Sequence, residues 1–220
     1  MEMIIEFVKL FIHDMPTALE NLSHAMGPWF YIVLFLIIFA ETGLIVTPFL
    51  PGDSLLFAAG AVCALPGAGL NVFLLGALLM CAALLGDTVN YNLARWASRK
   101  FIASGSVPFV KAEHLERTNE FFAKHGGKTV VLARFLPIVR TYAPFVAGAG
   151  AMPRWRFFTY SVVGAITWIS LFLGLGFFFG NQPAIRANFK YVILTIIVIS
   201  VIPAVIEFVR ARRAVGAKQT

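Results

Sequence analysis

The sequence FLPGDSLLFAAGA occupies residues 49–61, and the related sequence FLPIVRTYAPFVAGA occupies residues 135–149. Both begin with Phe-Leu-Pro, and both end with a phenylalanine followed by small residues that finish on Gly-Ala. The prolines interrupt any helix that runs through these stretches, because proline has no backbone N–H to donate. Two related, proline-broken apolar segments are typical of inverted-repeat transporters, in which such segments build a polar site at mid-bilayer.

The composition indicates a membrane protein. Of the 220 residues, 59% are hydrophobic and 13% are charged, and the mean hydropathy is +0.82. A soluble domain needs more polar surface than this sequence supplies. The formal net charge is +7, but no basic stripe interleaved with aromatic residues is present, so nucleic-acid binding is not expected. Cys63 and Cys81 lack metal-binding or disulfide spacing and are interpreted as small core residues.

Apolar runs and their breaks predict an all-α, polytopic fold. Spans need about 20 apolar residues, and shorter runs bounded by proline or glycine predict re-entrant hairpins. We expect about four spans and two oppositely oriented re-entrant hairpins. The spans are placed at residues 29–47, 71–96, 157–179 and 191–209, and the hairpins around residues 53–65 and 129–152. Residues 3–12 show helical spacing of apolar side chains, which fits either an interfacial helix or an ordinary packing helix.

We therefore treat residues 1–220 as one membrane domain with internal divisions. An N-terminal interfacial segment, a first repeat, a cytoplasmic polar segment, a second repeat and a basic tail follow one another at residues 1–28, 29–98, 99–128, 129–209 and 210–220. With both termini in the cytoplasm, Arg186 and Lys190 are the basic residues placed outside, and Arg134 and Arg140 lie within the second hairpin. The positive-inside rule favours this orientation over its mirror image.

Charged side chains within the short apolar segments are the candidate site residues. They are Glu41, Asp53, Arg134 and Arg140. A charge at the bilayer centre costs about 2.5–3.5 kcal/mol on insertion scales, so these four are expected to neutralise one another where the hairpins converge. Interfacial placement of the carboxylates and snorkelling of the arginines toward the headgroups are the alternatives.

The chemistry of these residues suits an anionic substrate. Arg134 and Arg140 are predicted to bind a phosphate headgroup, because the guanidinium group pairs with phosphate through two parallel hydrogen bonds. A carboxylate surrounded by apolar groups is protonated more easily than one in water, so Glu41 and Asp53 are predicted to couple transport to protons.

Asp87 is a secondary candidate, interpreted as an interfacial cap with a relay or gate role as the alternative. No pair of the four histidines has metal-ligand spacing, and no histidine falls in an apolar segment. We therefore expect no metal site and no cofactor, and we expect that the protein is not an enzyme.

Several motifs resemble those of the bacterial DedA family. They are ETG at residues 41–43, FLPGDS at 49–54, GD at 86–87 with NY at 90–91, KHGGK at 124–128 and ARFLPIVRT at 133–141. The resemblance implies an inner-membrane protein of the VTT-domain, or SNARE-associated, superfamily with re-entrant hairpins. It implies roles in returning undecaprenyl phosphate or phospholipids across the bilayer, in membrane-potential and pH homeostasis, in cell division and in resistance to cationic peptides.

The resemblance also places the family's essential acidic pair on Glu41 and Asp53 and its arginine pair on Arg134 and Arg140. The expected partners are an anionic lipid, protons and membrane lipids. The spacing from Gly176 to Gly180 permits close helix packing, either within the chain or in a homodimer. A non-transporting membrane scaffold and a lipid phosphatase or transferase are the alternative functions.

Overall fold

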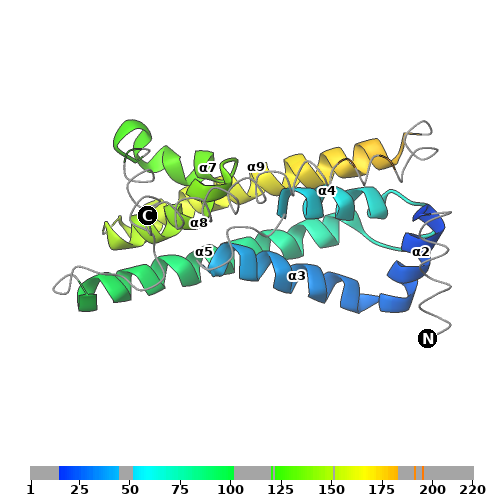
Figure 1. The fold of residues 1–220 in the computed structure, drawn as a ribbon, viewed down its shortest axis with the longest axis horizontal. Helices are drawn as coiled ribbons and strands as arrows, with labels where there is room; N and C mark the ends of the chain where they lie inside the picture. Colours follow the sequence, from blue (N-terminus) through cyan, green and yellow to red (C-terminus); the bar gives the residue numbers. More distant parts are fainter. Residues whose placement is uncertain are drawn as a thin grey trace, which may run out of the picture. The chain divides into compact units, whose positions relative to one another are not determined.

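The computed structural model describes residues 15–44, 52–101, 120, 122–150, 152–182, 191 and 195. These residues form helices joined by short turns, and no β-strand occurs among them, so the all-α prediction is confirmed for this part of the chain (Figure 1). Several expected features lie outside the described residues. They are the helix at 3–12, the first Phe-Leu-Pro at 49–51, the polar stretch at 102–119, nearly all of the last span and the basic tail.

Two described helices are long and apolar enough to cross a membrane. They are α5 (Val72–Phe101) and α9 (Arg154–Gly180), which match the spans expected at residues 71–96 and 157–179. A third candidate span arises if the end of α2 (Met15–Met26) and α3 (Pro28–Gly43) count as one broken helix. The described residues thus contain two or three of the four spans that we expect.

Helix α3 ends earlier than the sequence predicts. It has 16 residues and stops at Gly43, and Leu44 already has an extended backbone with φ −103° and ψ 119°. The Thr42 hydroxyl donates to the Ile38 carbonyl at 2.9 Å. Such a side-chain bond competes with the regular helix, and glycine favours a helix least among residues other than proline. The sequence Thr42-Gly43 therefore ends the helix before the apolar run is over.

The chain forms two compact units. Unit 1 contains Met1–Met26, Pro51–Val72 and Phe172–Thr220, and unit 2 contains Gly27–Leu50 and Phe73–Leu171. Each unit combines residues from both halves of the sequence, and the division into two repeats stays a prediction.

In unit 1, the short apolar helix α4 (Gly52–Cys63) packs against the last turns of α9. A Cβ atom at Gly60 would collide with the backbone of Leu173, and one at Gly176 would collide with the backbone of Phe57. Gly180 approaches the backbone of Ala61 in the same way. Gly176 and Gly180 therefore permit close packing within the chain, and the homodimer stays a prediction.

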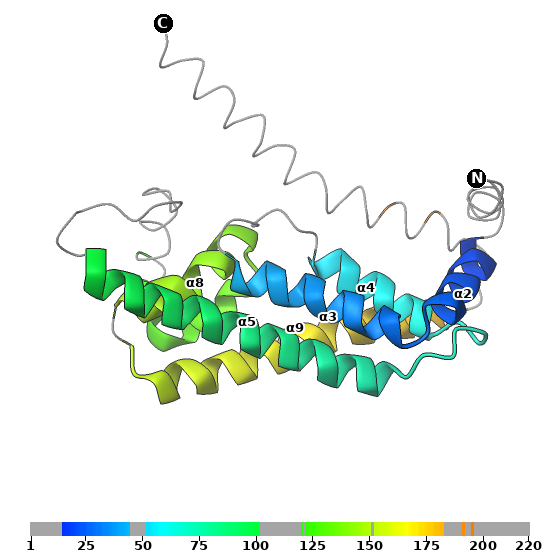
Figure 2. The same cartoon turned by 90° about the horizontal axis from the view of Figure 1, so that it is seen from below.

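In unit 2, glycines bring α3 and α5 together, and the two helices run side by side (Figures 1 and 2). A Cβ atom at Gly43 would lie 3.2 Å from the Gly86 Cα atom. The short helix α7 (Thr129–Ala133), which follows the turn η1 (Gly126–Lys128), contacts α8 (Pro137–Ala149). Helices α7 and α8 form the helical hairpin expected around residues 129–152; its re-entry from one membrane face stays a prediction.

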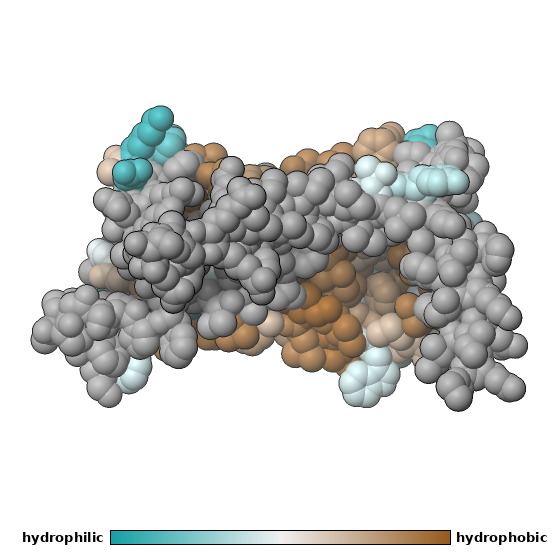
Figure 3. Space-filling view, viewed as in Figure 1, coloured by the Kyte–Doolittle hydropathy of each residue, from teal (hydrophilic) through white to brown (hydrophobic). Residues whose placement is uncertain are grey.

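The side chains that the long helices expose are largely apolar. Figure 3 shows brown, hydrophobic residues over much of the described surface in that view. The large exposed side chains include Phe73, Leu85, Trp96, Phe158 and Phe178. Cys63 is buried as expected, but Cys81 is exposed on α5, which corrects its interpretation as a core residue. Apolar surfaces of this kind indicate contact with a membrane.

Candidate functional site

The turn between α7 and α8 positions the two arginines of the site. Leu136 has an extended backbone with φ −121° and ψ 107°, and Pro137 stands at the start of α8. A residue before proline avoids the helical region because its backbone clashes with the proline ring. The second Phe-Leu-Pro therefore ends α7 and turns the chain, which places Arg134 in the turn and Arg140 in the first turn of α8.

Arg140 forms a buried ion pair with Glu41 of α3. Its Nη2 atom donates to Glu41 Oε1, and the residues expose only 9% and 3% of their surfaces, respectively. An ion pair removed from water is stable only when both partners are in place, because either charge alone would be left desolvated. Two residues that the sequence singles out thus contact each other, although they lie 99 positions apart.

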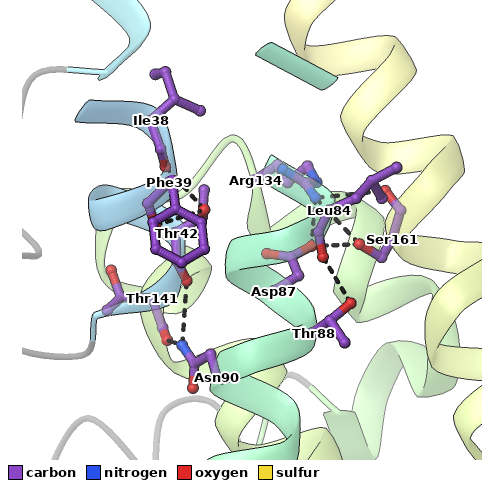
Figure 4. A network of polar contacts seen from close by, with 10 residues as sticks. All are labelled: Ile38, Phe39, Thr42, Leu84, Asp87, Thr88, Asn90, Arg134, Thr141 and Ser161. Atoms are coloured by element: carbon purple, nitrogen blue, oxygen red, sulfur yellow. Dashed lines mark hydrogen bonds and ion pairs between the residues drawn. The ribbon is translucent and has the colours of Figure 1, made fainter. Parts of the chain in front are cut away.

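Arg134 forms a second buried ion pair, with Asp87 of α5 (Figure 4). The distance from Arg134 Nη2 to Asp87 Oδ2 is 2.5 Å, and the Ser161 hydroxyl of α9 donates to the same carboxylate oxygen. Arg134 Nη2 also lies 3.3 Å from Ser161 Oγ. Asp87 is 5% exposed and sits in the interior of α5, so its interpretation as an interfacial cap is wrong.

Trp168 of α9 lies beside both guanidinium groups. Its ring centroid is 5.7 Å from Arg134 Cζ and 5.3 Å from Arg140 Cζ, and the side chain is completely buried. At these distances the ring face attracts each cation. One aromatic ring therefore helps to hold both arginines.

Asn90 connects the segments that carry the two ion pairs. Its Nδ2 atom donates to the Thr42 carbonyl at 3.4 Å and to the Thr141 carbonyl at 3.1 Å (Figure 4). Thr42 follows Glu41 and Thr141 follows Arg140, so this amide fixes the backbone beside both members of one pair. Asp87 and Asn90 are three positions apart, so they share one face of α5. Helix α5 therefore supports both ion pairs from a single face.

The predicted site residues are only partly gathered. Glu41, Arg134 and Arg140 lie together in unit 2, whereas Asp53 lies in the first turn of α4 in unit 1 and is half-buried. The participation of Asp53 in the same site stays a prediction. Within the described ranges no group of three or more His, Cys, Asp or Glu side chains is arranged to hold a metal ion.

Sequence reasoning missed Ser161, Trp168 and the bridging role of Asn90. Ser161, Ala165 and Trp168 recur at helical spacing, and all three are almost completely buried. This spacing is the signal that identifies one inward face of α9. The spacing does not stand out in the sequence, because the outward face of a membrane helix is as apolar as its inward face.

Replacing Trp168 with leucine is expected to lower stability, because the site loses its aromatic face and a cavity forms. Removing a desolvated cation–π contact costs about 2 kcal/mol, and lost packing adds roughly 1–3 kcal/mol. Trp168→Phe keeps a ring face and is expected to lose less. Thermal unfolding in detergent measures this difference, with Trp29→Leu as the control at a position that is 65% exposed. Equal melting of Trp168→Leu and Trp29→Leu would contradict the assigned contact.

Comparisons with known proteins show which family the chain belongs to. Residues 50–178 match the model of the VTT domain. The chain is 47% identical over 211 residues to Protein DedA of Escherichia coli strain K12, and the alignment covers 96% of each chain. It is 34% identical over 153 residues to Inner membrane protein YqjA of the same strain, with 70% of this chain and 69% of YqjA covered.

An uncharacterized membrane protein of Mycobacterium tuberculosis strain H37Rv is 34% identical over 181 residues, covering 82% of this chain and 79% of its own. No solved structure matches the chain. The VTT domain covers more than half of the sequence, and the identity to Protein DedA extends over nearly all of it. The chain therefore belongs to the DedA family of membrane proteins.

Proposed function

We propose that this protein is a proton-coupled transporter that moves a lipid with a phosphate headgroup between the leaflets of the bacterial inner membrane. Undecaprenyl phosphate or a phospholipid is the proposed cargo, and both termini are placed in the cytoplasm. The observation that carries the proposal is the pair of buried arginines beside Trp168, each held by one carboxylate. The relative YqjA is named an inner membrane protein, which supports the proposed location.

The hydrogen-bonding capacity of Arg134 supports phosphate binding. Its Nη2 atom contacts Asp87 and Ser161, but no described residue accepts a hydrogen bond from its Nε or Nη1 atom, although both are buried. Leaving a buried donor unsatisfied costs about 1–3 kcal/mol. A phosphate oxygen would satisfy these donors. The Nε atom lies against Gly164, so the arginine has to move from this closed position before a headgroup can reach it.

Competition between carboxylate and phosphate provides a route to proton coupling. A phosphate that takes the place of Glu41 at Arg140, or of Asp87 at Arg134, leaves that carboxylate without its guanidinium partner. A carboxylate stripped of its partner in a dry site is neutralised by taking up a proton. Each displaced carboxylate would then bind one proton as the anionic headgroup binds. Asp53 of unit 1 is proposed as a further proton carrier.

One observation favours a second function, a non-transporting scaffold. Both ion pairs are closed, which is the arrangement expected if the charges only lock helices together. A transporter in its resting state has the same arrangement, so the two functions are separated by activity. A phosphatase or transferase is the third candidate, and it predicts release of inorganic phosphate or a modified lipid.

The proposed function is tested in proteoliposomes that contain a headgroup-labelled phosphate lipid. We expect the purified protein to move the headgroup at least about tenfold faster than protein-free vesicles, and a protonophore to remove the effect of an imposed pH gradient. Access of a membrane-impermeant reagent to the label measures the movement. The Glu120→Gln variant, altered at an exposed residue, serves as the matched control. Movement at the rate of empty vesicles would refute transport, and released phosphate would favour an enzyme.

A further inference from the structure

Unit 2 contains a cavity, lined by both polar and apolar residues, that lies away from the ion pairs. It has a volume of about 670 Å³ and lies between η1, the C-terminal end of α8 and the first two turns of α9. None of the four residues of the two ion pairs lines it. Cavities between about 300 and 1,000 Å³ are typical of small-molecule sites. This one has room for a lipid headgroup and the beginning of its chains, but not for a whole lipid.

The wall of the cavity has the chemistry of an amphiphile site. Phe122, Val146 and Met152 contribute apolar side chains to the lining, whereas Arg156 provides a cation and Thr159 a hydroxyl group. Among the residues that the structure describes, no acidic side chain lines it. Gly126, which also lines the cavity, has φ 58°, a conformation that favours glycine. An anionic headgroup with apolar chains complements this combination.

The cavity lies at the end of a candidate span. Helix α9 begins with Arg154, Trp155 and Arg156, and the Arg156 guanidinium lies 5.3 Å from the Trp155 ring centroid. Basic residues and tryptophan at the end of a membrane helix indicate the level of the lipid headgroups. Lys124 and Lys128 are exposed on the flanking segment and add positive charge. The site is therefore placed where an anionic phospholipid presents its phosphate.

We infer that this cavity binds an anionic phospholipid, with the phosphate at Arg156, beside Thr159, and the upper acyl chains along Phe122, Val146 and Met152. The inference goes beyond the proposed transport, because it uses neither ion pair and does not require the bound lipid to move. The protein would retain such a lipid even if it were only a scaffold. Binding and translocation can therefore succeed or fail separately.

The test measures binding of dioleoyl phosphatidylglycerol and dioleoyl phosphatidylcholine to the detergent-purified full chain by native mass spectrometry. We expect about tenfold tighter binding of the anionic lipid. Both lipids carry a phosphate that can pair with Arg156, but only phosphatidylcholine also brings a choline cation close to the basic residues Arg156, Lys124 and Lys128, which repel it. Arg156→Gln removes the cation, and Thr159→Trp fills the cavity. Each variant is expected to weaken binding of the anionic lipid at least fivefold.

Two matched controls stand on the same helix. Thr167, like Thr159, is exposed and donates its hydroxyl to the carbonyl four residues earlier, but it does not line the cavity. Arg154 is an exposed arginine two positions from Arg156 and is also outside the lining. Thr167→Trp and Arg154→Gln are expected to bind like the wild type. The inference is overturned if the wild type shows no preference for the anionic lipid, or if each variant behaves like its control.

Discussion

Exchanging the charges of one buried pair, as Glu41→Arg with Arg140→Glu, is expected to give a protein that folds but moves lipid at the background rate. The two charges still attract each other, so the contact between α3 and α8 is kept. The guanidinium, however, now stands on α3, and the α7–α8 hairpin retains only Arg134 for the phosphate. A phosphate site built from two neighbouring arginines does not survive this exchange. Headgroup movement in proteoliposomes measures the loss.

The single variants provide the controls for the exchange. Glu41→Arg and Arg140→Glu each place two like charges together in a buried position, which costs at least as much as removing one partner, about 3–5 kcal/mol. Each is expected to be largely aggregated in detergent, and the double variant is expected to recover much of the lost thermal stability. Full lipid movement by the double variant would show that this ion pair only holds the helices together, and it would refute phosphate binding at Arg140.

Replacing Asp87 with asparagine is expected to be among the most destabilising single changes in the described chain. It leaves Arg134 charged and 3% exposed, with its carboxylate partner removed. Breaking a buried pair in this way costs about 3–5 kcal/mol, a large part of the stability of an ordinary domain. The midpoint of thermal aggregation, followed by size-exclusion chromatography in detergent, measures the effect.

A double variant separates the loss of the pair from the loss of one partner. Asp87→Leu with Arg134→Leu removes both charges, and such replacements are often neutral, so we expect it to melt close to the wild type. The matched control is Thr88→Ala, because Thr88 follows Asp87 on α5 but is exposed and bonds only to its own helix. If Asp87→Asn melts like Thr88→Ala, the pairing of Asp87 with Arg134 does not stabilise the fold.

The elements of the fold followed from local rules. The long apolar runs predicted α5 and α9 to within a few residues, and Pro137 predicted the break that separates α7 from α8. The predicted end of α3 was wrong. The prediction used hydropathy, which contains no information on the hydrogen bond of the Thr42 hydroxyl or on the close approach of Gly43 to Gly86. Local sequence thus identifies where helices are possible, whereas neighbouring helices help to decide where they end.

The partners of the charged residues could not be predicted in the same way. The sequence indicated that Glu41, Arg134 and Arg140 needed compensation, since an isolated charge is costly in an apolar segment. It did not indicate that Asp87 pairs with Arg134, because a one-dimensional pattern contains no distances between helices. The inward face of α9, with Ser161 and Trp168, was equally hidden, since the residues facing lipid and those facing the protein are both apolar.

The sequence by itself determined that this is an all-α membrane protein of the DedA family and that several of its charges are costly where they stand. Composition, apolar run length and proline placement are local properties, so they can be read without coordinates. The tertiary structure decided which carboxylate pairs with which arginine. It also placed Trp168 beside both guanidinium groups and Asn90 against the backbone next to one pair. The pairing of these residues depends on how α3, α5, α8 and α9 are aligned against one another. Close contacts at glycines set this alignment, and such contacts form only when the helices pack together.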